Sequence, residues 1–209
     1  MKLTASVFLL AAALFVPLFS LRAIGPFDFW WWMSANLLLL CSLAAGLDRS
    51  FGLAIREDFA SRRLTKVALG LGSALVLYGV FFVGNILARK IFSFAGDNIS
   101  AVYDFREGAS PWRIALLMTL IIGPGEELFW RGFLQRRLQT QAGPWRGLAL
   151  ATVLYAAVHI ASWNPILVLA ALVCGLFWGL LYLRYQSMLL NMLSHLLWDV
   201  AIFLLLPVT

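Results

Sequence analysis

The sequence predicts an all-α protein, a polytopic membrane helical bundle with about seven transmembrane helices. Of the 209 residues, 62% are hydrophobic and only 12% are charged, and the mean hydropathy is +0.88. Soluble domains carry about 25% charged residues, so this composition indicates an integral membrane protein. About seven apolar runs, each long enough to span a bilayer, are separated by short polar segments. The spans leave no room for a separate soluble domain.

Three of the predicted spans lie in the first half of the chain. The first is Leu3–Leu21, which lies between Lys2 and Arg22 and has no small-residue cleavage site. We therefore interpret it as a retained helix and not as a signal peptide. The second, Phe29–Leu47, opens with three tryptophans, which are typical of the membrane interface. The third is Val67–Ala88.

Two longer polar connections join these spans to the rest of the chain. Asp48–Lys66 contains five basic residues. It could lie as a short amphipathic helix on anionic lipid, but we favour a simple cytoplasmic anchor loop. Arg89–Arg113 is the longest predicted loop.

Four further spans are predicted in the second half, at Ile114–Gln135, Gly147–Trp163, Ile166–Leu183 and Met188–Val208. Gly175 and Gly179 have the GxxxG spacing that allows two helices to approach closely. We expect residues 1–110, with three spans, and residues 111–209, with four, to form one integrated membrane domain.

The basic residues predict the orientation of the bundle. With a cytoplasmic N-terminus, the inner segments hold ten lysines and arginines and the outer segments hold five. Short loops and the lack of a targeting extension suggest a bacterial inner membrane. The basic residues form no stripe interleaved with aromatics, so no nucleic-acid partner is expected. Cys41 and Cys174 lack the spacing of a metal site or a redox pair.

The most informative span is Ile114–Gln135, because it contains adjacent glutamates and an arginine. Each ionisable group inside a span costs a few kcal/mol or more, so such groups indicate a functional site. Glu127 and Arg131 are i, i+4 neighbours and can pair. Glu126 lies about 100° around the helix and can face a cavity. Gly123-Pro124-Gly125, just before them, is expected to loosen or kink the helix.

Both histidines also fall inside predicted spans. Tyr155 and His159 share one helix face, as do His195 and Asp199. At 1.5 Å of rise per residue, both histidines and Glu126 lie near the middle of the bilayer. We therefore expect Glu126, His159 and His195 to converge on one cavity.

These residues resemble the motifs of the CPBP family of intramembrane endopeptidases, the CAAX-processing and bacteriocin-processing proteins also called Abi proteins. The family pattern is EExxxR, FxxxH, and HxxxN or HxxxD. The chain supplies Glu126–Arg131, Tyr155–His159 and His195–Asp199 in that order. The resemblance covers about Pro111 to Val208.

The chain departs from the family pattern at two positions. Tyr155 stands where phenylalanine is usual; it keeps the ring and adds a hydroxyl, so little loss is expected. Asp199 takes a place often held by asparagine, and an aspartate donates a hydrogen bond only when it is protonated. A simple oxyanion-binding role for Asp199 is therefore in doubt.

The resemblance implies an intramembrane endopeptidase that hydrolyses a peptide bond of a membrane-associated or lipidated protein. The implied partners are membrane lipid and this peptide or protein substrate. The implied catalytic residues are Glu126, Glu127, Arg131, His159, His195 and Asp199.

Two catalytic schemes remain open. In the favoured one no cofactor is needed: Glu126 is the general base, and His159 helps to position the water. His195, oriented by Asp199, stabilises the oxyanion or delivers the proton. Glu127 with Arg131 holds the motif in shape. In the other scheme Glu126, His159 and His195 bind zinc and leave one position open for water. The sequence has no HExxH motif, which disfavours the helix-borne zinc site of soluble metalloproteases.

Two non-proteolytic functions also remain open. One is a membrane scaffold that sequesters a partner. The other is a proton-coupled transporter, which the lack of internal repeats disfavours.

Overall fold

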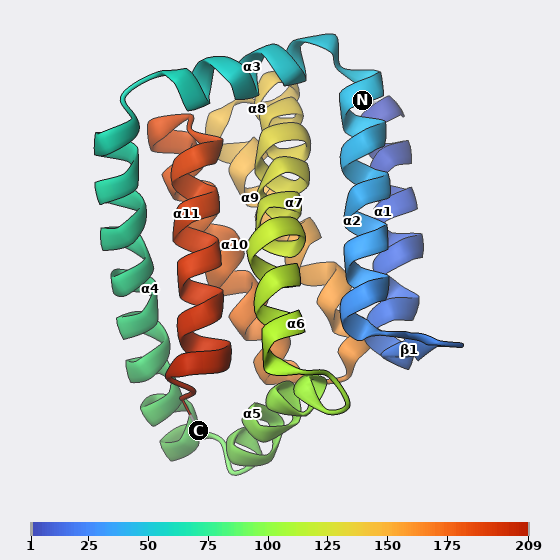
Figure 1. The fold of residues 1–209 in the computed structure, drawn as a ribbon, viewed down its shortest axis with the longest axis vertical. Coiled ribbons are helices and arrows are strands. Elements are labelled where there is room, and N and C mark those ends of the chain that lie inside the picture. The colour runs from blue at the N-terminus through green and yellow to red at the C-terminus, as the bar shows by residue number, and fades with distance from the viewer. Residues whose placement is uncertain (1, 209) are drawn as a thin grey trace.

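A bundle of helices that run between two ends makes up the computed structural model, which describes residues 2–208 (Figure 1). The elements of the first half are α1 (Lys2–Leu21), β1 (Ala23–Ile24), β2 (Phe27–Asp28), α2 (Phe29–Leu47), α3 (Arg49–Ala60), α4 (Arg63–Ile91), α5 (Ala95–Tyr103) and the 3₁₀ turn η1 (Asp104–Arg106). Those of the second half are α6 (Pro111–Leu117), the π-helical η2 (Met118–Ile122), α7 (Gly123–Glu126), the π-helical η3 (Glu127–Gln135), α8 (Arg136–Ala142), α9 (Pro144–His159), the 3₁₀ turn η4 (Ile160–Ser162), α10 (Pro165–Tyr185), α11 (Met188–Asp199) and the π-helical η5 (Val200–Leu205). The predicted all-α helical bundle is confirmed, and a short antiparallel hairpin of β1 and β2 joins α1 to α2.

Five helical runs within residues 2–208 are long and apolar enough to cross a membrane, namely α1, α2, α4, α10 and the run Met188–Leu205. The other two predicted spans are helical but less regular. Helix α9 has 16 residues, and the run from α6 to α8 alternates α-helical and π-helical pieces around the charged motif. Both extend along the bundle (Figure 1). The total of about seven crossings therefore stays a prediction.

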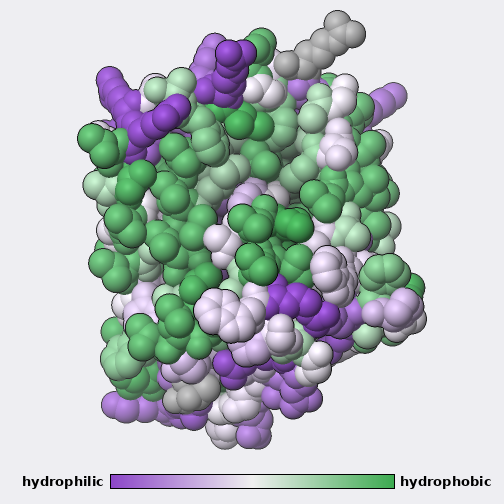
Figure 2. All heavy atoms as spheres, viewed as in Figure 1, coloured by the Kyte–Doolittle hydropathy of each residue, from purple (hydrophilic) through white to green (hydrophobic). Residues whose placement is uncertain are grey.

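The outer surface of the bundle has the pattern of a membrane protein. Apolar side chains cover the middle of the face in Figure 2, and hydrophilic side chains gather toward its two ends. Large apolar residues on α4, such as Leu75 and Val76, are exposed to 74% and 59%. In water such an apolar surface would be costly, whereas lipid tails accept it. Together with the apolar helices, this surface supports an integral membrane protein.

Capping residues determine where several helices begin. The capping side chains are Asp28 for α2, Ser110 for α6, Asn164 for α10 and Ser187 for α11. Each accepts a hydrogen bond from a first-turn N–H that has no partner within the helix. Pro111 and Pro165 then occupy the first helical position, where a missing N–H costs nothing.

The two longer connections contain helices that we did not predict. Helix α3 lies across one end of the bundle, so Asp48–Lys66 is largely helical and the expected polar loop is corrected, while its role as a cytoplasmic anchor stays a prediction (Figure 1). Phe51 on α3 is buried, and Gly132 makes room for it: a Cβ at Gly132 would lie 3.0 Å from the Phe51 ring. The predicted loop Arg89–Arg113 contains α5 and η1.

The GxxxG pair of α10 faces α9. A Cβ built on Gly175 would lie 3.2 Å from the Tyr155 ring, and one on Gly179 would lie 2.5 Å from Leu148. These glycines therefore let α9 and α10 approach closely, as the spacing predicted. Tyr155, which contacts Gly175 here, also carries its hydroxyl to Glu126 of the motif helix.

Candidate active site

The glutamate motif lies on a helical run whose backbone is disturbed as the sequence led us to expect. Pro124 has no backbone N–H, and the helix is π-helical before and after α7. The Gly123 N–H donates to the carbonyl of Met118, five residues back. The Gly125 carbonyl accepts a hydrogen bond from the Cys41 thiol at 3.4 Å. The disturbance thus takes the form of π turns beside the two glutamates.

Glu127 is held by several donors inside the bundle. Its Oε1 lies 2.9 Å from Nη1 of Arg131, so the predicted i, i+4 pair forms. Its Oε2 accepts a hydrogen bond from Nδ2 of Asn191 at 3.0 Å. Glu127 is 0% exposed and Arg131 is 2% exposed. This carboxylate is therefore saturated with donors and closed to water.

His195 on α11 lies between the two glutamates. Its Nδ1 is 2.7 Å from Oε1 of Glu127, and its ring stacks on Trp178 with 3.7 Å between centroids. Its Nε2 lies 3.4 Å from Oδ2 of Asp199 and 3.7 Å from Oε2 of Glu126. We expected Asp199 to orient this ring. The shorter contact shows that Glu127 orients it, while Nε2 is directed toward Glu126 and Asp199.

Glu126 faces α9 and contacts Tyr155. The Tyr155 hydroxyl donates to Oε2 of Glu126 at 2.8 Å. The same ring lies below the Arg131 guanidinium, whose Cζ is 4.8 Å from the ring centroid. Tyr155 therefore contacts both the available carboxylate and the arginine that pairs with the other one. We expected little effect from the hydroxyl, and this contact is a feature that the sequence did not reveal.

His159 at the end of α9 is fixed by its own helix. Its Nδ1 lies 2.8 Å from the Tyr155 carbonyl. Because a carbonyl oxygen only accepts, we assign the proton to Nδ1, which leaves Nε2 of the neutral ring available as an acceptor. The ring packs on Phe19, with 4.5 Å between centroids.

One cavity of about 340 Å³ joins these groups. The predicted site residues that line it are Glu126, His159, His195 and Asp199, together with Tyr155. Most of the remaining lining is apolar. Glu127 and Arg131 lie behind the cavity wall, in contact with His195 and Tyr155 respectively. The structure thus brings all six predicted site residues into one cluster.

Two residues of this cluster were missed in the sequence. Asn191 lies four residues before His195, on the same face of an otherwise apolar helix, and this placement was a usable signal. Trp178 had no such signal, because a tryptophan within an apolar span is ordinary. Besides stacking on His195, it donates from Nε1 to the Ser194 hydroxyl at 3.1 Å.

The zinc scheme that the sequence left open needs Glu126, His159 and His195 as ligands of one ion. Within residues 2–208, no three histidine, cysteine, aspartate or glutamate side chains lie close enough together to hold a metal ion. Nδ1 of both histidines is also engaged, one with a backbone carbonyl and one with Glu127.

The part of the chain that carries this cluster matches the model of a known protein family. Residues 108–201 match the family model described as type II CAAX prenyl endopeptidase Rce1-like. Comparisons with curated proteins and with solved structures found no match. The matched stretch includes all three motifs and excludes α1 to α5. The resemblance to CAAX proteases is therefore confirmed over residues 108–201, which match the Rce1-like endopeptidases.

Proposed function

We propose that this protein is a glutamate-dependent intramembrane endopeptidase that cleaves a membrane-associated protein or peptide without a metal cofactor. The observation that carries the proposal is the unequal use of two adjacent carboxylates. Glu127 is saturated by three partners, whereas Glu126 lines the cavity and, within residues 2–208, accepts a hydrogen bond only from Tyr155, through Oε2. A general base needs such an available carboxylate within reach of water.

In this proposal Glu126 activates a water molecule in the cavity. The carboxylate accepts a proton as the water oxygen bonds to the carbonyl carbon of the substrate. The same proton then passes to the leaving nitrogen as the C–N bond breaks, which yields an acid and an amine. Tyr155 holds Oε2 of Glu126, so Oε1 is left to contact the water.

The histidines support the developing charge. When His195 is protonated on both nitrogens, Nε2–H can donate to the carbonyl oxygen, which becomes negative during attack. Glu127 and the Trp178 ring fix the orientation of His195. His159 lines the same cavity and helps to position the water through Nε2. Arg131 pairs with Glu127 and holds it in place.

We further propose that the protein works in a bacterial inner membrane with its N-terminus in the cytoplasm. The support is the charge asymmetry of the bundle: ten basic residues lie in the segments at the α3 end and five in those at the α5 end. Cytoplasmic segments carry the excess of lysine and arginine. Membrane lipid would then surround the apolar outer surface.

The test is cleavage of a defined peptide by purified protein in lipid nanodiscs. The probe is a fluorescence-quenched peptide that ends in an S-farnesyl cysteine and three further residues, because the matched family is described as CAAX prenyl endopeptidases. The same peptide without the prenyl group is the comparison. We expect Glu126→Gln to lower kcat by about 10²–10⁴-fold. Glu57→Gln, an exposed acid on α3, is the matched control and should cleave as wild type does.

Metal dependence is decided on the same preparation. Protein treated exhaustively with chelator should keep its cleavage rate while its metal content falls to zero. Loss of activity with the metal, and its return with stoichiometric zinc, would show that the metal-free scheme is wrong.

A further inference from the structure

Beyond the catalytic groups, the cavity is lined mostly by apolar side chains, so the few polar groups there stand out. Two of them use their donors inside the protein: the Trp30 indole donates to a backbone carbonyl at 2.9 Å, and the Tyr103 hydroxyl donates to another at 3.1 Å. Trp198 and Asn85 also line this part of the cavity. Each of them has a donor that no group among residues 2–208 accepts.

The first unused donor is the indole N–H of Trp198. Trp198 lies three residues after His195 on α11, and its Nε1 is buried without a hydrogen-bond partner within residues 2–208. Edge-to-face contacts with Trp178 and Phe81, at 5.5 Å and 4.7 Å between centroids, hold the ring in place. A buried donor without a partner is costly, so its position beside the catalytic groups points to a partner that a ligand supplies.

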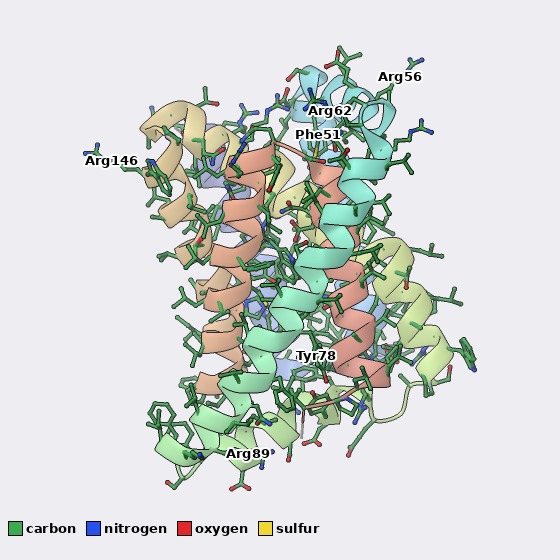
Figure 3. The ribbon with its side chains drawn as sticks, turned by 90° about the vertical axis from the view of Figure 1, so that its left-hand side faces the viewer. Phe51, Arg56, Arg62, Tyr78, Arg89 and Arg146 are labelled. Carbon is green, nitrogen blue, oxygen red and sulfur yellow. The ribbon has the colours of Figure 1, made fainter. Side chains whose placement is uncertain are left out.

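The second unused donor is the amide of Asn85 on α4. Its Oδ1 accepts a hydrogen bond from Nε of Arg89 at 2.9 Å, one helical turn further along. This contact orients the amide and leaves Nδ2 without a partner in the described part of the chain. Figure 3 labels Tyr78 and Arg89 on α4, and Asn85 lies between them in the sequence, toward the α5 end of the bundle. Polar side chains inside apolar spans are costly and mark substrate pathways.

Phe81 connects the two donors. It lies one helical turn before Asn85, so the two side chains share a face of α4, and its ring lies against that of Trp198. Helices α4 and α11 pack along each other, as Figure 1 shows. Asn85 and Trp198 therefore reach the same part of the cavity from two neighbouring helices.

This part of the cavity is one short step from the catalytic groups. Three residues of an α-helix rise by about 4.5 Å, which separates Trp198 from His195 along α11. One residue of an extended peptide spans about 3.3–3.6 Å. A peptide whose scissile carbonyl lies beside His195 therefore brings the carbonyl of a residue one or two positions away within reach of Trp198.

We propose that Nε1 of Trp198 and Nδ2 of Asn85 form a subsite that binds backbone carbonyl oxygens of the substrate within two residues of the scissile bond. This inference rests on the proposed function, because the ligand is the peptide that is cleaved. Both groups are neutral donors, which match carbonyl oxygens, and the apolar walls accept the neighbouring side chains. Every residue of a peptide offers such a carbonyl, so the subsite aligns the chain without selecting its side chains.

Binding of an uncleaved peptide tests the subsite. The background is Glu126→Gln, and fluorescence anisotropy in nanodiscs measures the Kd of the farnesylated probe peptide. Trp198→Phe keeps an aromatic ring, and Asn85→Asp keeps the contact with Arg89, but each removes the unused donor. Each should weaken binding by about three- to ten-fold. Trp112→Phe, at a tryptophan that is 83% exposed, is the matched control and should bind as the background does. Unchanged Kd in both subsite variants would overturn the proposal.

Thermal unfolding provides a readout that needs no substrate. Trp198→Phe loses no hydrogen bond inside the protein, so its melting temperature should stay close to that of wild type. Trp30→Phe loses the bond to the Phe105 carbonyl and should melt about 2–4 °C lower. An equal fall in both variants would show that the Trp198 N–H is used within the fold, and would overturn the proposal.

Modified substrates test which carbonyls are bound. In four versions of the probe peptide, one carbonyl within two residues of the scissile bond is replaced by a thioamide, whose sulfur is a weak acceptor. At least one version should raise KM about three-fold or more in wild type with little change in kcat, and should cost nothing further in Trp198→Phe. Equal KM for all versions would overturn the subsite.

The outcomes also separate this inference from the proposed function. If wild type cleaves no probe peptide but Glu126→Gln binds it through Trp198 and Asn85, the endopeptidase proposal fails and the subsite stands. If wild type cleaves the peptide and neither donor variant changes Kd or KM, the function stands and the subsite is wrong. If the peptide is neither bound nor cleaved, both are wrong.

Discussion

The buried ion pair of the motif allows a stability prediction with a magnitude. Arg131→Ala removes the cation 2.9 Å from Glu127 and leaves that carboxylate with Asn191 and His195 as partners. Removing one member of a buried ion pair costs about 3–5 kcal/mol. For a chain of this size each kcal/mol shifts the melting temperature by about 2–4 °C, so we expect a fall of about 6–20 °C. Tryptophan fluorescence during thermal unfolding in nanodiscs measures it.

A half-exposed pair provides the matched control. Arg113 is paired with Asp28, and their side chains are 30% and 33% exposed. Such pairs contribute about 0–1 kcal/mol, so Arg113→Ala should lower the melting temperature by at most about 4 °C. Adding Glu127→Gln to Arg131→Ala should recover part of the larger loss, because no unpaired charge then remains buried. Equal shifts in the two arginine variants, or a double variant less stable than Arg131→Ala, would refute this reasoning.

Three further predictions concern the hydroxyl beside Glu126 and the polar contacts at the α3 end. Tyr155→Phe removes the donor to Glu126 and should lower kcat about ten-fold with little change in KM. Tyr182 is a buried tyrosine outside the cavity, so Tyr182→Phe should keep the kcat of wild type. Equal kcat in wild type and both variants would contradict the role assigned to the Tyr155 hydroxyl. Asp58 accepts hydrogen bonds from Lys66 Nζ at 2.6 Å and from the Leu189 N–H at 2.8 Å. Asp58→Ala should therefore destabilise the fold by about 1–3 kcal/mol, measured by thermal unfolding. If Asp58→Ala is as stable as Glu57→Ala, a variant at an exposed position, the structural role of Asp58 is contradicted. The Ser50 hydroxyl, helped by Arg136 and Arg137, holds the pKa of Asp48 below its ordinary value. Asp48 therefore stabilises the folded state above about pH 4 and loses this effect as the pH falls through its lowered pKa. Asp48→Asn keeps the helix cap and should reduce the loss of melting temperature on acidification. Parallel pH profiles of melting temperature for wild type and Asp48→Asn would exclude this contribution of Asp48.

The membrane class and the main site residues were readable from the sequence because lipid imposes simple rules. Long apolar runs predict membrane-spanning helices, and a charged residue inside such a run is costly enough to indicate a functional site. Glu127 and Arg131 could be paired from their spacing alone, since four residues bring two side chains onto one helix face. His195 could be placed in the same cluster because it was one of two histidines in apolar spans. These inferences use only the period of the helix and the cost of buried charge.

The contacts between helices could not be derived in the same way. The hydrogen bond from Tyr155 to Glu126 depends on how closely α9 approaches the motif helix, and that distance depends on packing between helices that are separate in the sequence. The orientation of His195 by Glu127 also follows from the rotation of α11, which no periodicity specifies. Helix α3 was missed because its mixed composition lies close to that of a polar loop.

The arrangement of hydrogen-bond donors also predicts where water is held in the cavity. Both oxygens of Glu127 have partners, so this carboxylate gains little from hydration. Glu126 accepts from Tyr155 through Oε2, and an unpaired carboxylate oxygen in an apolar setting is costly. The cavity walls toward α5 are mostly apolar, so a water molecule finds its acceptors at the inner end, near Glu126 and Asp199. Water is then expected beside the proposed base before any substrate arrives, and an apolar peptide segment can fill the rest of the cavity without displacing it.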